Sequence, residues 1–117
     1  MTDEAFRPLD TIADWNDALE RSKQTPILVF KHSATCSISA KANEEMTTLS
    51  TEEDFPVFRV VVQDSRSVSD EIAESLNVRH ETPQAILIRD EDAIFDTSHL
   101  NVTVDTLRKE LRRAPAE

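Results

Sequence analysis

The apolar run Ile27-Leu28-Val29-Phe30 is the feature that most limits the folds open to this chain. A strand with one face in water alternates apolar and polar residues, whereas an unbroken run suits a strand that is buried on both faces. Strands of that kind lie in the middle of a sheet that carries helices on both sides. The run therefore predicts an α/β fold with this strand near the centre of its sheet.

Two amphipathic helices flank this strand in the sequence. Thr11 and Asp14 have the spacing of a capping box, which predicts a helix over residues 11–23 that ends before Pro26. After the strand, apolar residues again recur every three or four positions and predict a helix that begins near Cys36. The apolar positions of this second helix are Ile38, Ala42, Met46 and Leu49.

The second half of the chain continues the alternation of strands and helices. Residues 55–62 are rich in β-branched and aromatic residues and predict a strand, and the helix that follows has Ser67 and Asp70 as its expected cap. Residues 84–98 predict a hairpin around the turn Asp90-Glu91-Asp92, where aspartate must tolerate backbone angles that glycine usually takes. A last helix is expected from Thr103 until Pro115 stops it.

This order of elements predicts a thioredoxin-like arrangement. A right-handed crossover places strands 27–31 and 56–62 side by side and parallel, and the hairpin then adds antiparallel to the open edge of the first strand. We expect a four-stranded mixed sheet flanked by helices, with an extra N-terminal helix. The length of 117 residues suits a single domain over residues 1–117, with a core of about 9–113.

Composition excludes several classes of function. The formal charge of −10 makes a nucleic-acid or anionic-lipid partner improbable. The chain has no glycine, which excludes the glycine-rich phosphate loops of nucleotide-binding proteins. It shows neither a signal sequence nor an apolar stretch of the roughly 18 to 20 residues that span a bilayer, so we expect a cytoplasmic protein without a membrane partner.

Cys36 is the only cysteine and the main candidate for a catalytic residue. A lone cysteine is often a small core residue, but this one stands between a buried strand and a helix start, beside the polar residues Thr35 and Ser37. Unpaired N–H groups and the positive end of the helix dipole stabilise a thiolate at such a position. Lys31 and His32 could add positive potential, although side chains alternate along a strand and at most one of the two should face the sulfur.

The segment Cys36-Ser37-Ile38-Ser39 has the frame of the redox motif C-x-x-C with serine in place of the second cysteine. Serine cannot expel a partner that is bound to Cys36, so a mixed disulfide must wait for an external thiol. We expect Thr35, Ser37 and Ser39 to support the thiolate, Ser39 through its hydroxyl.

Thr82-Pro83 directly precedes the predicted strand at residue 84 and forms the second part of the candidate site. Cis peptide bonds are almost confined to proline, and a cis-proline loop faces the active cysteine in thioredoxin-like proteins. We therefore expect a cis bond here, with the backbone of Thr82 pairing with the molecule that is bound to Cys36.

The segments FKHSATCSIS, HETPQ and SHLNVT resemble the monothiol bacilliredoxin family, thioredoxin-like proteins associated with the thiol bacillithiol. The likeness spans roughly residues 9–111. It implies that Cys36 is the active cysteine, Ser39 the serine three residues on, and Thr82-Pro83 the family's Ser-Pro or Thr-Pro pair. The family motif reads T-C-P-I-S, so Ser37 replaces a proline and should leave the loop less rigid.

The resemblance also implies the reaction and its participants. Cys36 would take bacillithiol from S-bacillithiolated proteins and be regenerated by another bacillithiol, a partner redoxin or a reductase. Bacillithiol is then a co-substrate, and no bound cofactor is expected.

Two other functions stay open from the residues alone. The chain could be a redox-silent thioredoxin-like binding module, or an iron–sulfur carrier of the monothiol glutaredoxin kind, whose C-G-F-S loop Ser37-Ile38 does not match. No pair of histidines has metal-ligand spacing, so no metal site is expected. His32 is a further candidate for substrate binding, and Arg66 could bind a carboxylate of the thiol ligand.

Overall fold

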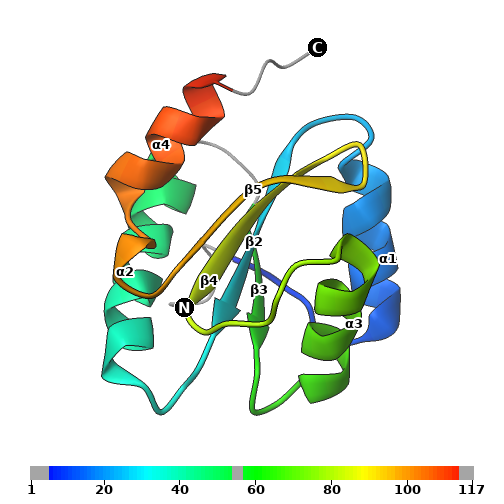
Figure 1. Cartoon of the computed structure of the whole chain (residues 1–117), viewed down its shortest axis with the longest axis horizontal. Helices are drawn as coiled ribbons and strands as arrows, with labels where there is room; N and C mark the ends of the chain where they lie inside the picture. Colours follow the sequence, from blue (N-terminus) through cyan, green and yellow to red (C-terminus); the bar gives the residue numbers. More distant parts are fainter. Residues whose placement is uncertain (1–5, 54–56, 114–117) are drawn as a thin grey trace.

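The computed structural model describes residues 6–53 and 57–113 of the chain, which form one five-stranded mixed sheet with helices on both faces (Figure 1). Its elements are β1 (Arg7–Pro8), α1 (Ile12–Arg21), β2 (Ile27–His32), α2 (Ser37–Glu53), β3 (Val57–Val61), α3 (Arg66–Leu76), β4 (Gln84–Arg89), β5 (Asp92–Ser98), the short 3-10 helix η2 (His99–Asn101) and α4 (Val104–Arg113).

The strands lie in the order β1-β3-β2-β4-β5, with β2 in the centre as its apolar run predicted. β2 pairs parallel with β3 and antiparallel with β4, which confirms the expected crossover and hairpin. The expected count of four strands was wrong, because Arg7–Pro8 also pairs parallel with β3. Both residues of this strand are exposed, so no apolar pattern marks it in the sequence.

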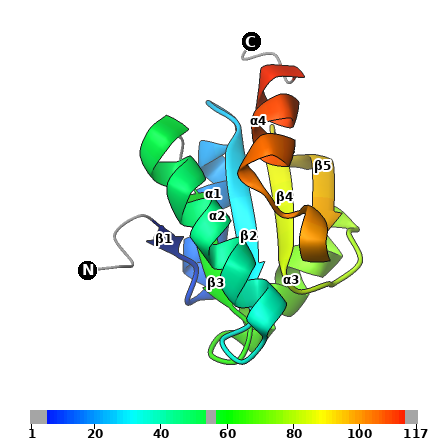
Figure 2. The ribbon, with the colours of Figure 1, turned by 90° about the vertical axis from the view of Figure 1, so that its left-hand side faces the viewer.

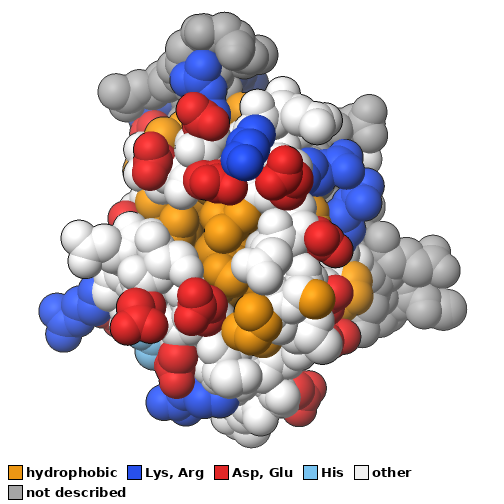
Figure 3. All heavy atoms as spheres, turned by 90° about the vertical axis from the view of Figure 1, so that its right-hand side faces the viewer, with side chains coloured by type: hydrophobic (Ala, Val, Ile, Leu, Met, Phe, Trp, Pro, Cys, Tyr) orange, Lys and Arg blue, Asp and Glu red, His pale blue; other side chains and the backbone are white. Residues whose placement is uncertain are grey.

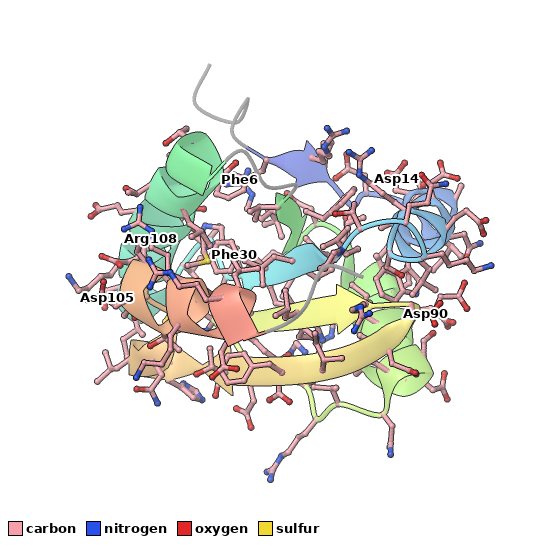
Figure 4. All side chains as sticks on the ribbon, turned by 90° about the horizontal axis from the view of Figure 1, so that it is seen from above. Phe6, Asp14, Phe30, Asp90, Asp105 and Arg108 are labelled. Atoms are coloured by element: carbon pink, nitrogen blue, oxygen red, sulfur yellow. The ribbon has the colours of Figure 1, made fainter. Side chains whose placement is uncertain are left out.

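Two apolar cores cover the two faces of the sheet, because the side chains of β2 alternate between them. Leu28 and Phe30 face α2 and α4, and Ile27 and Val29 face α1 and α3. Phe6 packs beside Phe30 in the first core, with ring centroids 6.0 Å apart (Figure 4). On the side of the molecule that carries α1 and α3, an apolar strip is exposed at the surface and carboxylates lie around it (Figure 3).

Local signals predicted the starts of α1, α2 and α4 correctly, while α1 ends at Arg21 and not at residue 23. The capping box of Thr11 and Asp14 is present at the start of α1. The predicted cap of α3 was wrong: the helix begins at Arg66 with Ser65 as the N-cap residue, not at Ser67 and Asp70. The reason is a tight turn directly after β3, in which the carbonyl of Val61 accepts the N–H of Ser65 at 3.0 Å. The first residues of the strand predicted over 55–62 and the stop at Pro115 lie outside the described residues.

In the hairpin turn, as predicted, residues other than glycine adopt backbone angles that glycine usually takes. Asp90 and Glu91 both adopt positive φ, at 55° and 67°. Ser22 supports them, since its carbonyl accepts the N–H of Asp90 at 2.7 Å and its hydroxyl accepts that of Glu91 at 2.9 Å. Within the described ranges no helix is both long enough and apolar enough to cross a membrane.

Candidate active site

The carboxyl ends of β2 and β3 bring two loops together at one end of the sheet. The loop after β2 leads into α2, and the turn after β3 lies beside it in both views (Figures 1 and 2). Val62 extends the pairing beyond β3, because its N–H donates to the carbonyl of His32 at 2.9 Å. The parallel pairing therefore fixes the position of residues 62–65 relative to the loop that carries Cys36.

Cys36 is the N-cap residue of α2, as the sequence predicted for a helix that begins near it. Its carbonyl accepts the N–H of Ala40 at 3.0 Å, and its own N–H points to the carbonyl of Ser33 at 3.5 Å. The thiol is free and half-buried. The residue is thus partly exposed and stands where the first turn of α2 presents N–H groups without helical partners.

Ser39 is fully buried and holds the loop before Cys36 from inside. Its hydroxyl accepts the N–H of Ser33 at 2.8 Å and lies 3.0 Å from Nδ1 of His32. His32 therefore points to the α2 side of the sheet. These contacts give Ser39 and His32 a role in shaping the loop, and the direct support of the thiolate by Ser39 stays a prediction. Ser37 is exposed as the first residue of α2.

Gln63 is a residue of the site that sequence reasoning missed. Its Oε1 accepts the N–H of Ala34 at 3.0 Å, and its Nε2 donates to the hydroxyls of Ser33 at 2.8 Å and Thr35 at 3.2 Å. Its place directly after a parallel strand is the one signal that could have identified it, because the carboxyl ends of parallel strands gather at one edge of a sheet.

The Thr82-Pro83 bond is cis, as predicted. The antiparallel register pairs Lys31 with Gln84, so Pro83 comes directly before this pair, at the end of β2 that leads into the Cys36 loop. Pro83 is buried, and its carbonyl accepts the N–H of His99 at 2.9 Å. The segment before β4 thus borders the site, while the binding role of Thr82 and Pro83 stays a prediction.

Lys31 points away from Cys36, into the face that α3 covers. It is fully buried, and its Nζ donates to the carbonyl of Ser69 at 3.1 Å and lies 3.1 Å from Nδ1 of His80. Burial lowers the pKa of Lys31 to about 8, although Asp70 opposes the shift. Burial, and then the charge of Lys31, also lower the pKa of His80. A neutral His80 that accepts from the Lys31 ammonium satisfies both groups.

Arg66 lies on the α3 side of the sheet, where it is the first residue of that helix. Its side chain is exposed and forms an ion pair with Asp70, with 3.6 Å between Nε and Oδ1. Its predicted contact with a carboxylate of the thiol ligand stays a prediction. In the described part of the chain, no group of three or more His, Cys, Asp or Glu side chains is placed to hold a metal ion.

Comparison with known proteins identifies the family and the fold that this chain resembles. Residues 7–107 match the family model Monothiol bacilliredoxin BrxC. A candidate oxidoreductase with a thioredoxin fold is 30% identical to this chain and has a TM-score of 0.84. The match covers 92% of this chain and 95% of the other.

Two thioredoxins, which are much less similar in sequence, share the fold. The thioredoxin of Fasciola hepatica is 19% identical with a TM-score of 0.76, over 94% of this chain and 100% of its own. Mitochondrial thioredoxin 3 of Saccharomyces cerevisiae is 12% identical with a TM-score of 0.73, over 97% and 100%. The expected thioredoxin-like fold is confirmed, and the matches together support a thiol redox role.

Proposed function

Because the chain belongs to the monothiol bacilliredoxin family, we propose that it removes bacillithiol from proteins that carry this thiol in a mixed disulfide. The observation that carries the proposal is the position of Cys36, a half-buried thiol that caps α2 in a chain with no second cysteine. The first-turn N–H groups of a helix stabilise a thiolate, which is the form of cysteine that attacks a disulfide.

The proposed reaction is a thiol–disulfide exchange without net oxidation or reduction. The Cys36 thiolate attacks the bacillithiol sulfur, the disulfide bond to the client protein breaks, and the client cysteine leaves as a thiolate. The product is a disulfide between Cys36 and bacillithiol. Attack on this sulfur instead of the client's own sulfur frees the client in one step.

Regeneration of Cys36 requires a thiol from outside the chain. Ser39 stands where a dithiol enzyme has its second cysteine, and a hydroxyl cannot replace a thiol in disulfide exchange. A second bacillithiol can attack the bacillithiol sulfur on Cys36, which releases the Cys36 thiolate and bacillithiol disulfide. A partner redoxin or reductase would do the same with its own thiolate, in a reducing compartment such as the cytoplasm.

The client is expected to bind between the start of α2 and the segment Thr82-Pro83. Thr82 is half-buried and directly precedes β4, so its backbone can pair with an extended segment of the client in the manner of an added strand. Pro83 directly precedes Gln84, which pairs with Lys31 near the end of β2, and this keeps the contact close to the loop of Cys36.

Intact-mass measurement of the protein tests this function. The reduced chain is exposed to bacillithiol disulfide and, separately, to glutathione disulfide, with Cys36→Ser as the control. We expect one bacillithiol adduct that is absent from Cys36→Ser, and faster labelling by bacillithiol than by glutathione. A client protein that carries bacillithiol should then lose it to Cys36 in the same assay.

Two results would contradict the proposal in different ways. Equal labelling by both disulfides would retain the monothiol chemistry but remove bacillithiol as the preferred thiol. A wild-type protein that takes up neither adduct would instead be a redox-silent binding module.

A further inference from the structure

The side chain of Gln63 contacts three successive residues immediately before Cys36. It accepts from the backbone of Ala34 and donates to the hydroxyls of Ser33 and Thr35, at distances of 3.0, 2.8 and 3.2 Å. The backbone N–H of Ala34 can only donate, so it fixes the amide oxygen on its side. Both amide hydrogens are then available for the two hydroxyls, and the amide uses its acceptor and both of its donors on this one loop.

Backbone hydrogen bonds hold the segment that carries Gln63. The N–H of Val62 donates to the carbonyl of His32, and those of Asp64 and Ser65 both donate to the carbonyl of Val61 at 3.0 Å. The backbone around Gln63 is therefore fixed by the end of β2 on one side and by its own tight turn on the other. Because the backbone of Gln63 is held relative to the sheet, its side chain can hold residues 33–35 in a defined position relative to the sheet.

The position of Cys36 depends on the loop that Gln63 holds. The N–H of Cys36 points to the carbonyl of Ser33 at 3.5 Å, and Thr35 is its direct neighbour. Ser39 supplies a second support from the buried side through the N–H of Ser33. The loop is thus held between a buried hydroxyl and an exposed amide.

We infer that Gln63 is a positioning residue for Cys36, which holds residues 33–35 so that Cys36 stays at the start of α2. The inference rests on the proposed function only in taking Cys36 as the reacting group. The bacilliredoxin motif has a proline at the start of this helix, and Ser37 replaces it here. The contacts of Gln63 would then supply order that the proline would otherwise give to the loop.

The expected consequence concerns reactivity more than stability. Gln63, Ala34 and Thr35 are exposed, so water can replace each hydrogen bond when the amide is removed, and the folding free energy should change little. Disorder in the loop would nevertheless let Cys36 turn away from the start of α2, where unpaired N–H groups and the helix dipole favour a thiolate. A shift in reactivity without a shift in stability is the signature of a positioning role.

Gln63→Met removes the hydrogen bonds and keeps the length of the side chain. The rate of Cys36 alkylation by iodoacetamide is measured from about pH 5 to pH 10, together with thermal unfolding. We expect the variant to react roughly fivefold to tenfold more slowly near neutral pH, with its half-maximal rate at a higher pH. The limiting rate at high pH should stay close to that of the wild type.

Gln63→Glu separates the contacts from the charge. A carboxylate can accept from Ala34 and from both hydroxyls once these turn to donate, so the loop stays held, but a negative charge now lies on the loop immediately before Cys36. We expect the pH of half-maximal alkylation to be higher in Gln63→Glu than in the wild type, and this difference should shrink as salt is added, since salt screens an exposed charge. The corresponding difference between Gln63→Met and the wild type should not depend on salt.

Gln24→Met is the matched control, because Gln24 is exposed in the turn before β2, at the opposite end of that strand from Cys36. The inference is overturned if Gln63→Met alkylates within about twofold of the wild type and of Gln24→Met. Iodoacetamide involves no bacillithiol, so the two proposals can fail separately. A wild type that takes no bacillithiol but alkylates faster than Gln63→Met contradicts only the function.

Discussion

The two segments next to the end of β2, residues 33–35 and 79–83, are held in place by different physical means. Residues 33–35 are tied by neutral groups, the exposed amide of Gln63 and the buried hydroxyl of Ser39. In residues 79–83, His80 contacts the buried ammonium of Lys31, while the amide of Gln84 donates to the carbonyl of Arg79 and the N–H of His99 donates to that of Pro83. The supports at Gln63 and Lys31 therefore differ, since the first is exposed and uncharged and the second is fully buried and charged.

This difference separates the placement of the nucleophile from the stability of the domain. A hydrogen bond that water can replace adds little to the folding free energy, although it fixes a geometry. A buried charge loses its hydration and must keep every partner, so removal of one member leaves the others unsatisfied. We therefore expect changes at Lys31 to act on stability and changes at Gln63 to act on the reactivity of Cys36.

The largest effect on stability is expected from Lys31→Ala. The substitution leaves a cavity under α3 and removes the donor to Ser69 and His80, so the free energy of unfolding should fall by about 2 to 4 kcal/mol. Urea unfolding near neutral pH measures this, with Lys31→Met as the volume-matched comparison. A loss of under about 1 kcal/mol in Lys31→Ala would show that Lys31 does not anchor this region.

The second largest effect is a dependence of stability on pH that comes from Lys31. The pKa of Lys31 is about 8 in the folded chain against an ordinary 10.5, so between these values the unfolded chain binds the proton and the folded chain does not. Stability then rises with pH. Relative to Lys31→Met, the wild type should gain on the order of 2 to 3 kcal/mol between about pH 7.5 and pH 10.5.

Urea unfolding of both proteins across this range gives the difference, in which titrations common to the two cancel. His80 and Asp70 act on Lys31, and the pKa of His80 is lowered from an ordinary value that already lies below this range. Parallel stability curves for wild type and Lys31→Met would contradict the lowered pKa of Lys31 and the burial of its ammonium.

The sequence predicted those parts of the site that depend on near neighbours. The apolar run of β2, the start of α2 near Cys36 and the turn at Asp90 all follow from the order of residues within one element. Thr82-Pro83 directly precedes β4, so its place in the fold also follows from neighbouring residues. Periodicity and turn chemistry act over this range, so a single sequence contains the information.

The two supports of the site could not be predicted in the same way, because their partners are distant in the chain. Gln63 lies 28 to 30 residues from the residues that it contacts, and Lys31 lies 49 residues from His80. Lysine at the end of an apolar run has the pattern of a strand leaving the core, yet Lys31 is fully buried. Only the pairing of the strands brings these groups together.

The smallest expected effect is the energetic coupling between the two supports. Among the described contacts, Gln63 and Lys31 share no hydrogen-bond partner, and they act on loops on either side of the β2 end. Their effects on the free energy of unfolding should therefore add within about 0.5 kcal/mol in a cycle of wild type, Gln63→Met, Lys31→Met and the double variant. A coupling above about 1 kcal/mol would mean that the two loops respond as one unit through β2, and the separation of placement from stability would not hold.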